Sequence, residues 1–196
     1  MASSGAYKSR INITIVGDGF VGKSCLVAAF LQQDFLVDSP PTMIETHLVE
    51  MFVDGQDYIL QIVDIGDSQK IAPDLFMETD CLVVCFSVDA INSYENVIFR
   101  WLPDVYSKCP MASLILVGTK LDLREGTPLP VASFQGLQLA KEIRANCYFE
   151  CSAKFQVSIA QIFQAAVRTV VQKYNSGPGL ERIKGEKNPT VYCTLL

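Results

Sequence analysis

Short apolar runs alternate with longer amphipathic stretches along most of the chain. Apolar runs of about four to eight residues are typical of buried strands, whereas apolar positions three or four apart are typical of helices that cover a sheet. The pattern predicts strands at 11–16, 48–53, 58–63, 81–88, 114–117 and 148–151. It predicts helices at 25–33, 93–107, 134–145 and 158–174. This alternation favours an α/β fold, with a mostly parallel six-stranded sheet and helices on both faces.

Turn and capping residues set the expected limits of these elements. Asp54-Gly55 lies between two apolar runs and predicts a hairpin. Pro103 is expected to kink or end the second helix. Ser158 and Gln161 predict a capping box at the start of the last helix. The chain therefore divides into a mobile leader (1–9), one domain (10–175) and a flexible tail (176–196), with predicted loops at 34–45 and 124–133 and an irregular stretch at 65–79.

One glycine-rich stretch after the first predicted strand carries specific chemistry. Its sequence, Gly17-Asp18-Gly19-Phe20-Val21-Gly22-Lys23-Ser24, matches the phosphate-binding pattern G-x-x-x-x-G-K-S. Backbone N–H groups of such a loop point inward, and the dipole of the following helix adds to their attraction for anions. Lys23 would supply positive charge for the β- and γ-phosphates, and Ser24 a hydroxyl for Mg²⁺. The stretch predicts a nucleoside triphosphate site.

Composition and charge argue against several other classes of protein. The chain has 196 residues, 49% of them hydrophobic, which suits one globular domain. Its net charge of −5 argues against a nucleic-acid-binding surface. The apolar run 81–86 is too short to span a bilayer, and the first five residues lack the apolar core of a secretory signal. Seven scattered cysteines without C-x-x-C spacing indicate reduced cytosolic thiols rather than a metal site.

Further polar motifs follow other predicted strands and are expected to meet the phosphate loop, because ligands of parallel sheets bind at the carboxyl ends of the strands. These motifs are Asp64, Thr119-Lys120-Leu121-Asp122 and Ser152-Ala153-Lys154. The Asp122 carboxylate can accept hydrogen bonds from both N1–H and the 2-amino group of guanine, a donor pair that adenine lacks. The stem of Lys120 can cover the flat base, and the Ser152-Ala153-Lys154 backbone can donate to guanine O6. The motifs predict a guanine nucleotide.

The chain resembles the Ras superfamily of small GTPases, and the Rho/Rac family in particular, over about residues 11–174 and at its C-terminus. The resemblance rests on the phosphate loop, on Pro41-Thr42 and on the segments 117–124, 135–137, 140–143 and 150–153. The segment 86–89 and the stretch from Glu95 to Trp101 are more similar to Rho than to Ras or Rab proteins. The family resemblance implies that residues 10–175 form a phosphate-loop G domain.

The resemblance also implies which residues bind GTP or GDP and Mg²⁺. Expected nucleotide contacts are Gly17, Gly19, Phe20, Val21, Gly22, Lys23, Ser24, Cys25, Phe35, Thr42, Gly66, Thr119, Lys120, Asp122, Leu123, Ser152, Ala153 and Lys154. Phe35 would stack on the base edge. Mg²⁺ would be held by Ser24 and Thr42 and, through water, by Asp64. GTP would order two switch loops, 40–47 and 65–79, and effectors would bind them only while they are ordered.

The segment after the magnesium aspartate departs from the family pattern D-T-A-G-Q. It is Asp64-Ile65-Gly66-Asp67-Ser68-Gln69, and the stretch up to Thr79 is a few residues shorter than usual. Either Gly66 is the γ-phosphate glycine after a deletion, or Asp67 takes that place. In neither register does the Gln that orients the attacking water directly follow the glycine. Gly66 and Gln69 are the candidate catalytic residues, and we expect slow intrinsic hydrolysis and a weak response to an activating protein.

Two further departures concern nucleotide exchange and partners. Ser39 stands where the family usually has a Tyr that closes over the phosphates, so we expect looser closure and faster exchange. The loop 124–133 lacks the short helical insert of Rho proteins, so partners that recognise the insert should not bind in the usual way.

The chain ends in Cys193-Thr194-Leu195-Leu196, which predicts geranylgeranylation of Cys193. A second membrane signal is weak, because the basic residues upstream alternate with Glu181 and Glu186. We therefore expect reversible anchoring to the cytoplasmic face of membranes, the plasma membrane in particular, with a cytosolic pool extracted by a prenyl-binding carrier.

These expectations describe a membrane-tethered GTP/GDP switch in signalling, with a link to the actin cytoskeleton by family analogy alone. The implied partners are an exchange factor, a GTPase-activating protein, a carrier and effectors, and no nucleic acid. Two alternatives stay open. A GTP-held, hydrolysis-deficient binding module is favoured by Asp67-Ser68. A Rab-like trafficking GTPase is disfavoured by the single-cysteine tail, by Leu123-Arg124 and by Trp101. A small-molecule kinase would leave the two base-recognition motifs unexplained.

Overall fold

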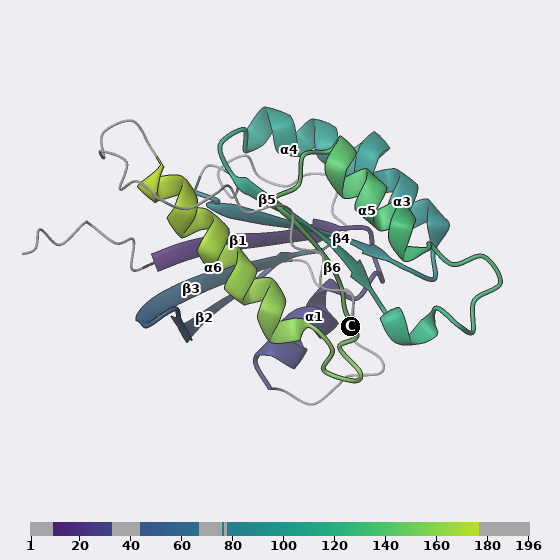
Figure 1. Cartoon of the computed structure of the whole chain (residues 1–196), viewed down its shortest axis with the longest axis horizontal. Helices are drawn as coiled ribbons and strands as arrows, with labels where there is room; N and C mark the ends of the chain where they lie inside the picture. The colour runs from purple at the N-terminus through teal and green to yellow at the C-terminus, as the bar shows by residue number, and fades with distance from the viewer. Residues whose placement is uncertain (1–9, 33–43, 67–75, 77, 177–196) are drawn as a thin grey trace, which may run out of the picture.

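Six strands form one sheet in the order β2-β3-β1-β4-β5-β6 (Figure 1). The strands are β1 (Arg10–Gly17), β2 (Ile44–Val53), β3 (Gln56–Ile65), β4 (Cys81–Ser87), β5 (Ser113–Thr119) and β6 (Cys147–Glu150). Only the β2–β3 pair is antiparallel; the other neighbouring pairs are parallel. The computed structural model describes residues 10–32, 44–66, 76 and 78–176. Predictions on Phe35, Ser39, Thr42, Asp67, Gln69 and Cys193 therefore lie outside the described residues.

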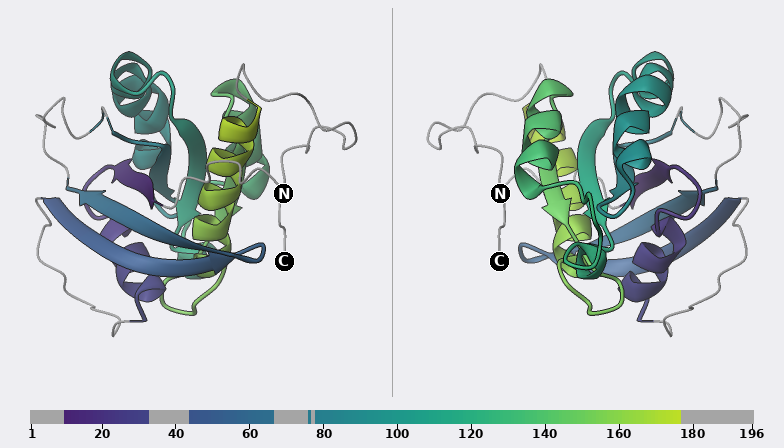
Figure 2. Two further views of the ribbon diagram at one scale, coloured as in Figure 1. Left: turned by 90° about the vertical axis from the view of Figure 1, so that its left-hand side faces the viewer. Right: turned by 90° about the vertical axis from the view of Figure 1, so that its right-hand side faces the viewer.

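Helices cover both faces of the sheet, as the sequence predicts. They are α1 (Lys23–Phe30), α3 (Ile91–Asn96), the π-helical turn η1 (Val97–Trp101), α4 (Leu102–Lys108), the 3₁₀ turn η2 (Leu121–Leu123), α5 (Ser133–Glu142) and α6 (Ile159–Asn175). One core cluster joins α1 and α6 to one face of the sheet, and a second joins α3–α4 and α5 to the other. Figure 2 shows these two helical layers and the long, twisted β2–β3 ribbon at the sheet edge. All seven residues of β4 are buried, because this central strand is covered on both sides.

The hairpin prediction is confirmed, but its first strand begins earlier than predicted. β2 starts at Ile44, which pairs with Ile65, so the prediction of a loop through Glu45 is wrong for its last two residues. The described parts of the predicted switch loops also include strand, at Ile44–His47 and at Ile65. Most side chains at the start of β2 are exposed, so the backbone ladder with β3 defines the strand there without an apolar pattern.

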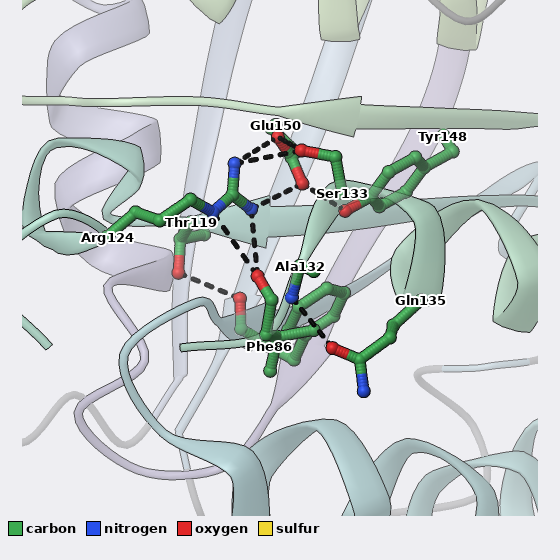
Figure 3. Close-up of polar contacts among 9 residues, drawn as sticks. Phe86, Thr119, Arg124, Ala132, Ser133, Gln135, Tyr148 and Glu150 are labelled. Carbon is green, nitrogen blue, oxygen red and sulfur yellow. Dashed lines mark hydrogen bonds and ion pairs between the residues drawn. The ribbon is translucent and has the colours of Figure 1, made fainter. Parts of the chain in front are cut away.

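The capping-box prediction for the last helix is wrong. Ser158 precedes α6 in a left-handed conformation, with φ +60°, and its side chain makes no capping hydrogen bond. A Gln side chain caps α5 instead: Gln135 Oε1 accepts a hydrogen bond of 2.8 Å from the Ala132 N–H (Figure 3). The helix does not end at Pro103, because this residue lies in the first turn of α4, which continues to Lys108. The π turn η1 ends two residues before it, at Trp101.

Two predictions about the whole chain can be compared with the described residues. The six cysteines among them are free thiols, in agreement with the prediction of reduced cysteines. Burial raises the pKa of the Cys85 thiol to about 12, so this thiol is unreactive. No helix in the described part of the chain has the length and apolar character to span a membrane.

Helix α5 approaches β6 through a glycine. A Cβ at Gly136 would lie 2.0 Å from Tyr148 Oη and 2.2 Å from its Cζ. The Tyr148 ring is buried, and its hydroxyl donates to Glu150 Oε1 at 2.7 Å, so the ring is held from moving aside. The close contact requires glycine in this helix.

We predict that Gly136→Ala destabilises the protein by about 1–3 kcal/mol, because the new methyl group overpacks the α5–β6 contact. Urea unfolding with matched nucleotide content measures the change. Gly126→Ala is the control, since the nearest atom to a Cβ there is Leu123 O at 3.8 Å. Equal unfolding midpoints for both variants and the wild type would contradict the packing argument.

Candidate nucleotide-binding site

The phosphate loop connects β1 directly to α1 and depends on close backbone packing. Gly17 has φ +146°, and a Cβ there would lie 2.2 Å from Cys85 O on the neighbouring strand β4. Gly22 precedes α1 in a left-handed conformation, with φ +94°. A side chain at Gly17 would push the loop away from the sheet, and one at Gly22 would strain the turn into the helix.

The side chain of Lys23 is buried and turns back across the loop. Its Nζ donates hydrogen bonds to Gly17 O at 2.8 Å and to Asp18 O at 2.6 Å. These carbonyls hold the ammonium group against the start of the loop. The loop thus combines fixed positive charge with the N-terminal end of α1.

The other loop residues differ in their surroundings. Val21 is buried, and its carbonyl accepts a hydrogen bond from the Thr119 hydroxyl at the end of β5. Phe20 is 83% exposed and has φ +62°, an unusual conformation for an aromatic residue. Cys25 is half-buried in the first turn of α1.

Ser24 and Asp64 lie together, as a magnesium site requires. Ser24 Oγ donates to Asp64 Oδ2 at 2.5 Å. The Asp64 side chain is buried, and its Oδ1 has no hydrogen-bond partner among the described residues. Burial raises the pKa of this carboxyl, which the hydrogen bond from Ser24 offsets in part. A hydroxyl and an unsatisfied carboxylate oxygen are the hard donors that Mg²⁺ prefers, so these residues fit the ion. When bound, Mg²⁺ would offset phosphate charge.

The two predicted base-recognition motifs also meet. Ser152 Oγ donates to Asp122 Oδ1 at 2.6 Å, and Leu121 N donates to Cys151 O at 3.0 Å. Lys120 is in a left-handed conformation, with φ +55°, and the Cγ and Cε of its stem lie 3.9 Å from the position that a Cβ of Gly22 would take. The structure therefore brings the phosphate loop and both base motifs to one edge of the sheet.

The other predicted nucleotide contacts among the described residues differ in exposure and in the groups that they pack against. Leu123 is 41% exposed in η2, and Ala153 packs against the core cluster on the α1–α6 side. Lys154 Nζ lies 5.3 Å from the centre of the Phe155 ring, and this ring contact orients its side chain. Gly66 is buried directly after β3. Gly19 lies within the loop between Asp18 and Phe20.

An ion-pair network behind the base loops was not predicted from the sequence. Arg124 donates to both carboxylate oxygens of Glu150, at 2.7 and 2.6 Å, and also to the Val131 carbonyl (Figure 3). Ser133 and Tyr148 donate to the same carboxylate. Burial alone would raise the pKa of Glu150, but these hydrogen bonds hold it below its ordinary value. The network ties 121–124 to β6 and so fixes Asp122 relative to Ser152. The sequence signal that could have predicted the network is the pair of opposite charges, Arg124 and Glu150, each two residues from a base-recognition residue, Asp122 or Ser152.

Comparisons with known proteins agree with this geometry. The model of the Ras family matches residues 12–172. The chain is 36% identical over 167 residues to the Ras-like GTP-binding protein RhoL of Drosophila melanogaster, covering 83% of this chain and 88% of RhoL. It is 34% identical over 184 residues to the human Rho-related GTP-binding protein RhoB, covering 87% of this chain and 94% of RhoB.

The fold and the site define a phosphate-loop GTPase domain. The chain belongs to the Ras family and is a Rho-like small GTPase, an enzyme class that hydrolyses GTP. The family resemblance of the sequence is thereby confirmed. Guanine nucleotide is the ligand of this family, and Mg²⁺ generally accompanies it.

We predict that Asp64→Asn raises the Mg²⁺ concentration needed to slow GDP release by about 10–100-fold, because a neutral amide orients and attracts the ion's shell less well than a carboxylate. Titration of the GDP release rate with Mg²⁺ measures this.

The pH dependence of Mg²⁺ affinity provides a second comparison of the wild type with Asp64→Asn. Burial raises the pKa of Asp64, so its carboxyl takes up a proton at a higher pH than an ordinary aspartate does, and the protonated carboxyl is a poor partner for Mg²⁺. Apparent Mg²⁺ affinity should therefore fall more steeply in the wild type than in Asp64→Asn as the pH is lowered from neutral. Parallel pH curves would show that Asp64 does not act on the ion.

Proposed function

We propose that this chain is a membrane-tethered GTP/GDP switch of the Rho type in which hydrolysis is slow. The observation that carries the proposal is the chemistry that follows Asp64. The carboxylate itself lies in a fitting magnesium position, beside Ser24. The residues after it, Ile65-Gly66-Asp67-Ser68-Gln69, contain no Gln directly after either candidate for the γ-phosphate position. We therefore expect the chain to bind GTP and Mg²⁺ normally but to hydrolyse GTP slowly, because the attacking water is poorly oriented.

The strand register supports a switch that involves both predicted segments. Ile44 pairs with Ile65 and Glu45 with Asp64, so the start of β2 and the end of β3 lie side by side. The start of β2 therefore lies beside Asp64 and the predicted magnesium site. In the family that the sequence resembles, bound GTP orders both switch segments, here 40–47 and 65–79.

A single-turnover measurement of phosphate release from bound GTP tests the slow step. We predict slower release than from a family member with the D-T-A-G-Q segment, assayed side by side. The variant with Asp67→Gly and Ser68→Gln recreates glycine followed by Gln in one of the two registers, and it should release phosphate faster than the wild type. Ser68→Ala is the control. Wild-type release at the rate of the reference protein would contradict the proposal.

The alternative is a GTP-held binding module that signals through exchange or abundance. Asp67 favours it, because a carboxylate near the γ-phosphate would oppose the developing charge of hydrolysis. No measurable release, with GTP still bound after repeated sampling, would favour the module. Measurable release that stops when Mg²⁺ is removed would favour the cycling switch. A Rab-like function receives no support, since the similar proteins reported above are named Rho-related or Ras-like.

Membrane attachment and partners form the second part of the proposal. The C-terminal Cys193-Thr194-Leu195-Leu196 supports geranylgeranylation, and the weak basic signal upstream supports reversible binding. The family implies an exchange factor, an activating protein, a prenyl-binding carrier and effectors. A role in actin signalling rests on family analogy alone.

We predict that Cys193→Ser moves the protein from the membrane to the soluble fraction, because the anchoring lipid is lost. Cell fractionation with detection of the tagged chain at its N-terminus measures the shift. Cys109→Ser is the matched control, because Cys109 is a buried thiol within the domain. Persistent membrane binding of Cys193→Ser would show that another feature anchors the chain.

A further inference from the structure

We propose that Asp18 is a positioning residue of the nucleotide site: its carboxylate, held by Asn96, Arg100 and Trp101, fixes the phosphate loop against the α3–η1–α4 helix. The proposal rests on the nucleotide-binding function described above. It assigns a role in phosphate binding to a helix that contributes no predicted nucleotide contact.

The Asp18 carboxylate receives donors from three side chains far away in the sequence. Asn96 Nδ2 donates to Oδ2 at 2.6 Å, and Trp101 Nε1 donates to Oδ1 at 2.8 Å. The Arg100 guanidinium lies 3.4 Å from Oδ1 and also 4.9 Å from the centre of the Trp101 ring. The Asp18 side chain is only 16% exposed, so these contacts are shielded from water and charge-assisted. They join the second residue of the loop to the helix that follows β4 and packs on the sheet.

The backbone of Asp18 links this contact to the phosphate-binding lysine. Its carbonyl accepts the 2.6 Å hydrogen bond from Lys23 Nζ, while its side chain is held by the helix. A shift of Asp18 would therefore displace an acceptor that holds the ammonium group. The effect should act on the β- and γ-phosphates, because these are the groups that Lys23 would contact.

The π-helical turn explains how two donors reach one carboxylate. Five residues along an α-helix rotate a side chain by about 140° beyond one full turn, which would point Asn96 and Trp101 in different directions. In a π turn the hydrogen bonds run from residue i to residue i+5, which brings residues five apart onto nearly one face. Pro103 is the second residue after the turn, and its missing N–H and bulky ring disfavour a regular α-helical bond to Phe99. The sequence thus favours the turn that aligns the donors.

A positioning role and simple charge repulsion predict opposite changes in nucleotide affinity when the Asp18 charge is removed. A carboxylate beside a phosphate-binding loop should repel phosphate, so removing its charge would tighten nucleotide binding if Asp18 had no other role. If the carboxylate positions the loop, its removal weakens binding instead. Asp18→Asn keeps the shape of the side chain but removes its charge and replaces one of the two acceptor oxygens by an N–H₂ group, so it cannot accept hydrogen bonds from both Asn96 and Trp101.

The test compares Asp18→Asn, Trp101→Phe and the double variant for GDP release rate and for GDP and GMP affinity. Trp101→Phe keeps an aromatic ring in the core and removes the N–H donor. Tyr106→Phe is the matched control, because it removes one hydrogen bond of the same helix, to Ile143 O, away from the loop. Thermal melting without nucleotide is recorded for every variant, which separates folding from binding.

We expect each single variant to release GDP about tenfold faster, the factor that corresponds to one lost hydrogen bond to a charged group. GDP affinity should fall much more than GMP affinity, because GMP lacks the β-phosphate. The double variant should lose less than the two single changes combined, since both act on the contacts of the same carboxylate. Tyr106→Phe should release GDP at the wild-type rate.

Several results would overturn the proposal. These are unchanged or tighter GDP binding in Asp18→Asn, equal losses of GDP and GMP affinity, or effects of the two single changes that multiply in the double variant. A wild-type protein that binds no GDP would overturn the nucleotide function itself and this proposal with it. GDP binding by the wild type together with unaltered variants would overturn the positioning role alone.

Discussion

The close packing of the phosphate loop against β4 is the constraint on which the site depends. Gly17 lies where a Cβ would be 2.2 Å from Cys85 O, so the loop leaves β1 in contact with the neighbouring strand. Lys23 and Thr119 then hydrogen-bond to loop carbonyls, at Gly17 and Val21. Hydrogen bonds within the chain thus fix the shape of the loop and hold its cation beside it.

Polar pairs distant in sequence position the rest of the site around this loop. Ser24 meets Asp64 at the magnesium position, and Asp122 meets Ser152 at the base position. Arg124 and Glu150 support the second pair from behind; both are half-buried and make further hydrogen bonds. Such pairs are costly to break, because removing one partner leaves the other desolvated. They place the groups that would bind phosphate, metal and base at one edge of the sheet.

Much of this arrangement could be predicted from the sequence, because its signals are local. Buried strands such as β4 are continuous apolar runs, and the phosphate loop and Asp122 lie within short motifs at strand ends. The rest depends on tertiary structure. The start of β2 at Ile44 follows from pairing with β3, and the Ser158 cap fails because that residue adopts a left-handed conformation. The contacts of Asp18 need both a π turn and a helix about 80 residues away, which no local pattern reveals.

The most direct test of the account is the equilibrium affinity of the purified chain for GDP, ADP and IDP in the presence of Mg²⁺. These nucleotides carry the same diphosphate, so differences report the contacts of Asp122 and the loops that support it. The account predicts that GDP binds more tightly than ADP by about 10⁴-fold, with IDP between them because hypoxanthine keeps N1–H but lacks the 2-amino group. Equal affinity for GDP and ADP would contradict a guanine site built from these motifs.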